Sequence, residues 1–317
     1  VISLNIENLI KVLKQKAVQH SNIPMLSRTH GQTASPTTMG KEFANFVQRI
    51  NSINKSIKGT SLKGKINGAV GNFNAHAIAY PDVNWEIVSR KFIKGLGLEV
   101  NTHTTQVEPK DSMAELFFNY VRLNNVLIDF SRDIWGYISL GYFKQKLKKG
   151  EIGSSTMPHK VNPIDFENAE GNLGLANSNF QHLSNAVVIS RWQRDLTDST
   201  VMRNIGLCYG HTNLALSSLL KGVYKLEINK DQLKHDLDSS WEVLTEAMQT
   251  IFRKHLIKDG YELMKELSRG KKISKEDLHN LIDKIDIPSE EKNALKNLTP
   301  SSYTGIANTL AKQLKDS

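Results

Sequence analysis

One long segment without proline, Asp111 to Phe143, constrains the fold of this chain more than any other feature. Its apolar residues recur every three or four positions, at Leu116, Tyr120, Leu123, Leu127, Phe130, Ile134 and Ile138. This spacing predicts a single helix. At about 1.5 Å per residue that helix would be about 50 Å long, which is more than one compact domain needs and is typical of an elongated bundle.

Two further helices are expected on the C-terminal side of this segment. Asn162 is a good N-cap, Pro163 suits the first helical position, and Asp165 places a carboxylate in the first turn. The helix that follows carries small residues that would let a neighbouring helix approach closely, at Ala169, Gly171, Gly174, Ala176 and Ser178. A third helix is expected to begin near Asp198 and to run past Leu219.

The remaining segments are shorter. Residues 63–80 are rich in Gly and Asn, which predicts a hairpin or an irregular loop and the only β structure of the chain. After Glu227 four shorter amphipathic units follow, at 231–256, 259–268, 274–285 and 288–297. We therefore predict an all-α, elongated helical bundle with a minor β-hairpin. Its central domain spans 1–225, and a small helical C-terminal domain spans 226–317.

Composition excludes several classes of protein. The hydrophobic content of 39% and charged content of 23% are ordinary for globular chains and disfavour a disordered one. No stretch approaches the roughly 20 apolar residues that span a bilayer. Cys208 is the only cysteine, which fits a reducing compartment such as the cytoplasm. A net charge of +9 favours an anionic partner, whether nucleic acid, a membrane surface or a phosphorylated metabolite.

The loop GEIGSSTMPHKVNP, residues 150 to 163, lies between two of the expected helices and has an unusual composition. Ser154 and Ser155 offer hydroxyls, Lys160 offers a positive charge, and the next helix points its first N–H groups towards the loop. These are parts of an anion site with a hydroxyl beside it, although a flexible linker is the plain alternative. A nucleotide P-loop fails on spacing, and no GxSxG elbow of a serine hydrolase occurs.

The same loop resembles the signature of the fumarase, aspartase and argininosuccinate lyase superfamily, GSSxMPxKxNP, over eleven consecutive residues. Within that superfamily, His159 and the text IDFENAEGNLGLANS resemble the adenylosuccinate lyases of a bacterial-type branch. Further matches are MLSRTHGQTASPTTMGKE at 25–42, KINGAVGNFNAH at 65–76 and SRWQRDLTDSTVMRN at 190–204. The resemblance therefore covers essentially the whole chain, in order.

The resemblance implies a β-elimination of fumarate from adenylosuccinate to give AMP, and from the succinylated imidazole-carboxamide ribotide. A base removes a proton next to a succinyl carboxylate, and an acid protonates the departing nitrogen. The base maps to Ser154, and the acid maps to His30 in SRTHGQ, which reads as a turn after a short extended segment. Other members of the superfamily, such as argininosuccinate lyase or fumarase, are the rival enzymes, and a basic helical nucleic-acid-binding protein is the rival from another class.

Substrate binding is also implied by the resemblance, residue by residue. Arg194 and Arg203 could fork onto phosphate, and the same segment supplies Ser199, Thr200, Val201 and Met202. Taken alone, such a segment could be a salt-bridge cluster with Asp195 and Asp198. Gln106 in HTTQVEP matches a position that contacts the substrate in members of the family. Lys160, Asn162 and Asn168 map to ligands of the succinyl part. Ser155 and Val161 are further substrate-binding candidates, and His159 is left unassigned.

The resemblance further implies a homotetramer whose active sites are each built from three chains, with no metal or redox cofactor. The partners are then small molecules (adenylosuccinate, AMP and fumarate), and neither nucleic acid nor a membrane is expected. The chain starts at Val1 inside a helical pattern with no start signal before it. We therefore expect an upstream region, which in this family supplies part of the nucleotide pocket and another histidine.

Overall fold

Helices form most of the described part of the chain in the computed structural model, which describes residues 1–146, 160–258, 260, 262–264 and 273–315. Unit 1 comprises residues 1–10, 48–136 and 152–224, and unit 2 comprises residues 11–47, 137–151 and 225–317. Helices α1 (Ile2–Gln19), α2 (Met39–Gly59) and α5 (Asp111–Ser139) each contribute residues to both units. The division into consecutive domains at 225 stays a prediction.

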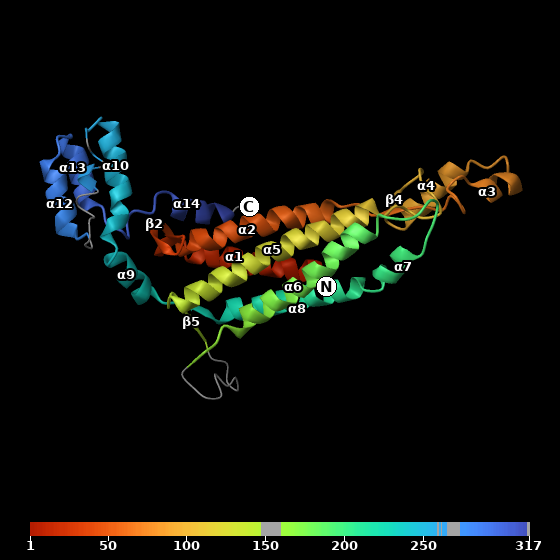
Figure 1. The fold of residues 1–317 in the computed structure, drawn as a ribbon, viewed down its shortest axis with the longest axis horizontal. Coiled ribbons are helices and arrows are strands. Elements are labelled where there is room, and N and C mark those ends of the chain that lie inside the picture. The colour runs from red at the N-terminus through yellow and green to blue at the C-terminus, as the bar shows by residue number, and fades with distance from the viewer. Residues whose placement is uncertain (147–159, 259, 261, 265–272, 316–317) are drawn as a thin grey trace. The chain divides into compact units, whose positions relative to one another are not determined.

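Unit 1 is built around three helices, α5, α6 (Ile164–Ala186) and α8 (Ile205–Lys225), which lie side by side (Figure 1). Their facing sides are aromatic: the rings of Tyr120 and Phe180 stack with centroids 5.4 Å apart, and Tyr209 meets Tyr120 edge-on at 4.9 Å. Such pairs add stabilisation beyond the burial of their apolar surface. The prediction of an all-α helical bundle is confirmed.

The long helix α5 contains 29 residues and ends at Ser139, four residues before the predicted end. Gly141 adopts a positive φ of 74° and donates its N–H to the carbonyl of Ile138, while Tyr142 donates to Tyr137. This pair of bonds is a Schellman ending, which glycine favours. Phe143 instead opens strand β5 (Phe143–Gln145), which pairs antiparallel with β6 (Leu226–Ile228).

The start of α6 differs from the prediction that Asn162 caps it. Pro163 is the N-cap, without a side-chain capping bond, and its carbonyl accepts the N–H groups of Phe166 and Glu167. The predicted carboxylate of Asp165 does lie in the first turn. The acidic first turn is the arrangement that the helix dipole favours.

The predicted third helix is two helices, α7 (Thr197–Met202) and α8. The break falls at Asn204, whose N–H bonds to the carbonyl of Val201 in a tight turn. The carbonyl of Asn204 then accepts the N–H groups of Leu207 and Cys208, which starts the next helix. A continuous helical pattern in the sequence therefore conceals an interruption of the helix.

The β structure lies largely outside the segment where it was predicted. The only strand within residues 63–80 is β3 (Lys63–Gly64), which pairs in parallel with β4 (Glu99–Val100). Residues 65–73 are irregular and α3 (Asn74–Ala79) follows them, so the irregular loop is confirmed there and the hairpin is wrong. After α3, Asn84 caps α4 (Trp85–Gly95) by accepting the N–H of Ile87. The β-hairpin of this chain is formed by β1 (Pro24–Thr29) and β2 (Gln32–Thr38).

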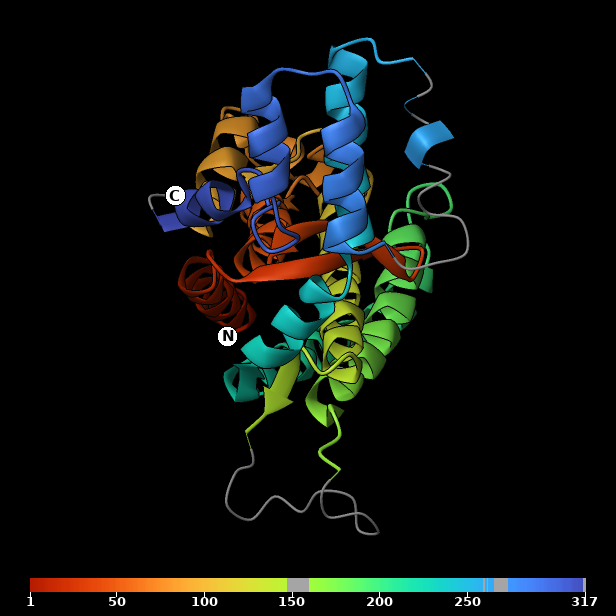
Figure 2. The same cartoon turned by 90° about the vertical axis from the view of Figure 1, so that its left-hand side faces the viewer.

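The C-terminal part of unit 2 contains shorter helices, as predicted. Among the described residues its elements are α9 (Lys230–Asp238), η1 (Trp241–Leu244), α10 (Thr245–Lys254), α12 (Lys275–Lys284), α13 (Ser289–Asn297), α14 (Ala307–Lys312) and η2 (Gln313–Lys315). The predicted unit at 231–256 is broken at Ser239 and Ser240, and 259–268 falls mostly outside the described residues. Helices α10, α12 and α13 stand side by side (Figures 1 and 2) and share a core that includes Met248, Phe252, Leu278, Ile282 and Leu295.

Candidate functional site

His30, the predicted acid, lies at the tip of the β1–β2 hairpin. Thr29 pairs with Gln32, so His30 and Gly31 are the two central residues of the turn. Both have positive φ, 52° and 75°, as a type I′ turn requires. The predicted turn after an extended segment is therefore confirmed, and the imidazole of His30 is exposed at its tip. Whether His30 acts as the acid stays a prediction.

Acidic side chains of the C-terminal helices hold this hairpin. The Arg28 guanidinium lies 2.8 Å from Asp236 Oδ2, and the same oxygen accepts the hydroxyl of Tyr142 at 2.7 Å. Tyr142 is fully buried, and burial together with its bond to Asp236 raises its pKa to about 12. On the other strand, Ser35 bonds to Glu246. The strands on either side of His30 are thus anchored to α9 and α10.

Gln106, a predicted substrate ligand, lies in the irregular segment between β4 and α5. Its N–H donates to the carbonyl of Gln193 at 3.2 Å, so the structure brings this segment against residues 190–204, here called the arginine segment. The ammonium of Lys65 holds the Gln106 segment by hydrogen bonds. It donates to three carbonyls, those of Gly68, Thr105 and Gln106, at 2.7 to 2.9 Å. Burial lowers the pKa of Lys65.

The motif KINGAVGNFNAH supports the Gln106 segment from one side. The buried amide of Asn67 donates to the carbonyl of Thr102 at 3.2 Å and accepts the hydroxyl of Thr104 at 3.0 Å. Gly71, at φ 85°, packs so closely that a Cβ there would overlap the carbonyl oxygen of Thr104. An open cleft lined by Gly71, Asn72, Thr102, His103, Thr104, Thr105 and Pro109 lies along this contact.

Replacing Gly71 with alanine is therefore expected to displace the Gln106 segment. An alanine there would be strained by the positive φ, and its Cβ would overlap backbone atoms. Overpacking of this kind lowers the free energy of unfolding by about 1–3 kcal/mol. Gly97→Ala is the matched control because Gly97 also has a positive φ, 77°, but nothing lies within 4 Å of its added Cβ. Thermal unfolding and substrate KM check this: Gly71→Ala should lower the midpoint further and raise KM. Equal effects of the two variants would contradict the proposed contact.

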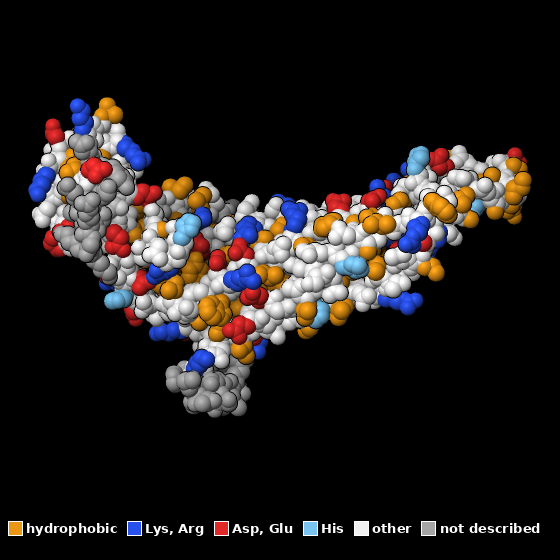
Figure 3. Space-filling model, viewed as in Figure 1, with side chains coloured by type: hydrophobic (Ala, Val, Ile, Leu, Met, Phe, Trp, Pro, Cys, Tyr) orange, Lys and Arg blue, Asp and Glu red, His pale blue; other side chains and the backbone are white. Residues whose placement is uncertain are grey.

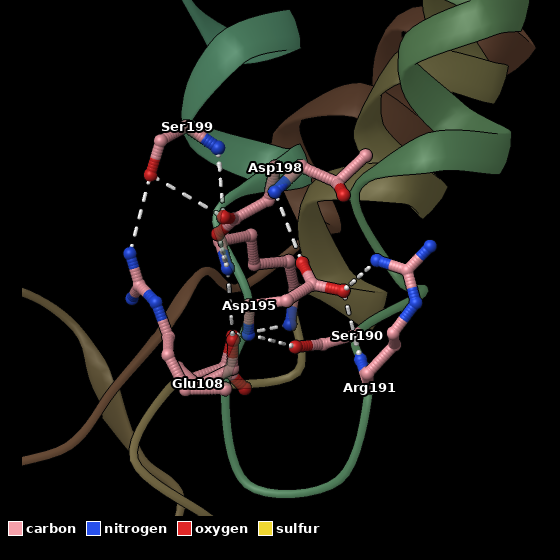
Figure 4. A network of polar contacts seen from close by, with 9 residues as sticks. Glu108, Ser190, Arg191, Asp195, Asp198 and Ser199 are labelled. Atoms are coloured by element: carbon pink, nitrogen blue, oxygen red, sulfur yellow. Dashed lines mark hydrogen bonds and ion pairs between the residues drawn. The ribbon is translucent and has the colours of Figure 1, made fainter.

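The arginine segment is ordered by two aspartates (Figure 4). Asp195 accepts the N–H groups of Arg191 and Thr197 at 3.0 Å, and Arg191 Nη1 lies 3.1 Å from the same carboxylate. These backbone bonds, with the charge of Arg191 a smaller contribution, lower the pKa of Asp195. Asp195 therefore pairs with Arg191, which leaves the guanidinium of Arg194 turned to a different partner.

Arg194 bonds to Ser199, and Asp198 sits behind that serine. Arg194 Nη2 lies 3.2 Å from Ser199 Oγ, and Asp198 Oδ1 accepts the N–H of Ser199 at 2.7 Å and its hydroxyl at 3.3 Å. The other oxygen of Asp198 pairs with Lys110 at 2.6 Å. Burial would raise the pKa of Asp198, but the bond and charge of Lys110 bring it below its ordinary value.

The other predicted ligands are placed separately. Thr200, Val201 and Met202 lie in α7, and Arg203, at its C-cap, is exposed. Lys160, Val161 and Asn162 precede Pro163, the N-cap of α6. Asn168 lies in α6, where its Oδ1 accepts the hydroxyl of Ser218 at 2.8 Å and the amide of Asn172 at 3.2 Å.

Ser154, Ser155 and His159 lie outside the described residues. The structure thus brings Gln106 to the Arg194 and Ser199 segment, and it places Asn168 among polar residues of α6 and α8. Within the part of the chain that the structure describes, no three His, Cys, Asp or Glu residues gather as metal ligands would. No helix of that same part is long and apolar enough to cross a membrane.

Sequence reasoning missed the roles of Lys110, Lys65 and Asn67 in this site. Lys110 reads as an ordinary surface lysine ahead of a helix, and its partner lies 88 positions away. The available signal was Asp198, already noted as a partner for a cation, although Lys110 rather than an arginine is its ion-pair partner. Asn67 and Lys65 occur in a quoted motif, but most of their partners are backbone carbonyls, which carry no sequence pattern.

Comparisons with known proteins place these motifs in context. The family model described as lyase matches residues 1–176, and that described as adenylosuccinate lyase C-terminal matches residues 190–304. Adenylosuccinate lyase of Escherichia coli (strain K12) is 54% identical over 97% of this chain and 67% of its own length. That of Vibrio cholerae serotype O1 is 54% identical over 99% of this chain and 69% of its own length.

Solved structures show the same fold at much lower identity. The 3-carboxy-cis,cis-muconate lactonizing enzyme from Pseudomonas putida superposes with a TM-score of 0.77 at 20% identity, covering 99% of this chain and 71% of that one. Fumarate lyase from Mesorhizobium sp. BNC1 gives a TM-score of 0.76 at 20% identity, covering 100% of this chain and 72% of that one. The helical bundle is thus common to proteins of different chemistry.

Proposed function

This chain belongs to the adenylosuccinate lyase family and is a lyase, and we propose on that basis that it eliminates fumarate from adenylosuccinate to give AMP in purine nucleotide biosynthesis. The observation that carries the proposal is the 54% identity to a curated adenylosuccinate lyase over 97% of this chain. We extend the proposal to the succinylated imidazole-carboxamide ribotide, which carries the same succinyl group on nitrogen.

The elimination needs one base and one acid. The base takes a proton from the carbon beside the succinyl carboxylate, the C–N bond breaks as the C=C bond of fumarate forms, and the acid protonates the departing nitrogen. We assign the base to Ser154 and the acid to His30. An imidazole can give a proton near neutral pH, and the turn at the tip of the hairpin presents that of His30 to solvent.

Substrate binding is assigned to the segments around this chemistry. Arg194, Ser199 and Arg203 would hold the phosphate, because a guanidinium fork and a hydroxyl suit its oxygens. Gln106 would bond to the substrate through its amide. Thr200, Val201 and Met202 complete the nucleotide side, while Ser155, Lys160, Val161, Asn162 and Asn168 complete the succinyl side. The backbone bond between Gln106 and Gln193 supports the placing of Gln106 beside Arg194.

Assembly into a homotetramer with shared active sites is also part of the proposal. Unit 1 leaves large hydrophobic side chains exposed, and Figure 3 shows them gathered over the segment that carries α3 and α4. They include Ile78, Tyr80, Ile87, Phe92 and Leu96. Buried subunit surfaces would account for them. We place the enzyme in the cytoplasm, where its one cysteine, the buried Cys208, would stay reduced.

An elimination assay tests the proposed function. The protein, expressed from its complete reading frame, should change the absorbance of adenylosuccinate solutions and release fumarate and AMP in equal amounts. Argininosuccinate and fumarate, offered separately, should remain unchanged. Cleavage of argininosuccinate in place of adenylosuccinate would reject the assignment. Binding to nucleic acid that weakens steeply with salt, with no elimination, would instead favour a basic scaffold protein.

A further inference from the structure

A shielded ion pair joins two of the segments assigned to substrate binding. Lys110 Nζ lies 2.6 Å from Asp198 Oδ2, and the two side chains are only 14% and 7% exposed. By comparison, the Lys58–Glu7 pair of the same unit is 53% and 47% exposed. Because a shielded pair is screened little by solvent and salt, it holds its partners in a more definite geometry than an exposed pair does.

Lys110 is fixed on its own side of the contact. It directly precedes α5 at a positive φ of 68°. Its N–H donates to Glu108 Oε2 at 2.7 Å, while Glu108 Oε1 accepts the amide of Asn101 at 2.9 Å. The ammonium also donates to the carbonyl of Glu108 at 3.4 Å. The backbone of Lys110 is therefore set before its side chain reaches the arginine segment.

Asp198 also holds one of the predicted phosphate ligands, Ser199, by hydrogen bonds. Its second oxygen, Oδ1, accepts both the N–H and the hydroxyl of Ser199, whose Oγ accepts Arg194 Nη2 (Figure 4). A guanidinium carries five N–H donors in a rigid plane, so one fixed bond directs the others. An ion pair and a series of hydrogen bonds thus connect Lys110 to Asp198, Asp198 to Ser199, and Ser199 to Arg194.

We propose that Lys110 and Asp198 are positioning residues for the phosphate end of the substrate, acting through Ser199 and Arg194. Two effects combine. The pair holds the hydroxyl and the guanidinium in the orientation that receives an anion, and Lys110 neutralises a carboxylate that would otherwise repel the phosphate. Neither residue needs to touch the substrate. This inference rests on the proposed function, because it takes the ligand of Arg194 to be a nucleotide phosphate.

The test compares Lys110→Met with Lys110→Arg and with Lys58→Met, which removes the same charge from the exposed pair. Calorimetry measures Kd for AMP and for adenosine, and the elimination assay measures KM and kcat. In Lys110→Met we expect the AMP Kd and the substrate KM to rise about tenfold to a hundredfold, as for loss of a charge-assisted hydrogen bond. The adenosine Kd should change by less than about threefold, because adenosine has no phosphate. The kcat should also change by less than about threefold, because phosphate contacts bind the ground state and the transition state equally.

The conservative variants separate positioning from general structure. Lys110→Arg should recover most of the AMP affinity, and Lys58→Met should bind AMP as the parent does. The double variant Lys110→Met with Asp198→Asn should bind AMP no more weakly than Lys110→Met alone, since the two residues act as one unit. It also removes the unpaired buried carboxylate, so it guards against a single variant that fails to fold.

Other outcomes would overturn the inference. Equal weakening of AMP and adenosine in Lys110→Met, or AMP weakening in Lys58→Met to the same extent, would show a general structural or electrostatic effect. Unchanged AMP binding in Lys110→Met, in a protein that does cleave adenylosuccinate, would reject the inference and leave the proposed function standing. Failure of the parent protein to cleave adenylosuccinate would reject the proposed function by a separate measurement.

Discussion

Replacing His30 with asparagine is expected to lower kcat for adenylosuccinate elimination by about 10²- to 10⁴-fold, the usual contribution of a positioned acid or base. The substitution removes the imidazole and keeps the turn. His30 has φ 52° and is followed by Gly31 at φ 75°, and Asn-Gly is the sequence that type I′ turns favour most. The hairpin and its bonds to Asp236 and Glu246 should therefore persist, so lost activity reports on the chemistry.

The measurement is kcat and KM for the parent, His30→Asn and His235→Asn. His235 is a suitable control because it is an exposed histidine of α9 in the same unit and lies outside the turn. We expect parental thermal stability in both variants, parental kcat in His235→Asn, and a loss confined to kcat and kcat/KM in His30→Asn. Full activity of His30→Asn would defeat the assignment of His30 as the acid.

Periodicity was enough to predict the helical bundle but not its breaks. The apolar spacing from Leu116 to Ile134 continues through α5, and most of that series, including Tyr120, Leu127 and Ile134, is buried. The turn at Asn204 has no such signal, since neither proline nor a glycine with positive φ marks it. The turn is formed by the bond from Asn204 to the carbonyl of Val201 and by the first bonds of α8. Helix propensity is a weak guide to such a break, because tertiary context overrides it.

The candidate site was predictable to the extent that its residues lie in continuous motifs. The turn at His30 was predictable because SRTHGQ reads as a turn after a short extended segment, and it lies in a stretch that carries the family resemblance. The pairing of Lys110 with Asp198 was not, because the two residues are 88 positions apart and meet only once the loops fold together. The same reason hid the contact between Gly71 and the carbonyl of Thr104. Long-range contacts between loops carry no periodicity.

Gly40 should tolerate no side chain, and Gly40→Ala is expected to destabilise the fold by about 3 kcal/mol or more, at the upper end of overpacking costs. The start of α2 lies directly on the end of α1: Gly40 donates its N–H to the carbonyl of His20 at 3.0 Å. A Cβ at Gly40 would lie 2.5 Å from Ser21 Cα and 2.6 Å from Ser21 N, and it would overlap the carbonyl of Ala17. These are backbone atoms, so no rotamer change relieves the overlap.

The control is Gly59→Ala, at the last residue of the same helix, where nothing lies within 4 Å of an added Cβ. Alanine there should be neutral or stabilising by up to about 1 kcal/mol, because it reduces the freedom of the unfolded chain. Thermal unfolding of both variants distinguishes the two positions, since helix propensity alone would favour alanine at each. If Gly40→Ala unfolded at the same temperature as Gly59→Ala, the contact between α1 and α2 would be looser than these distances require. A large loss confined to Gly40→Ala would instead show that backbone contact at this helix crossing is what requires glycine.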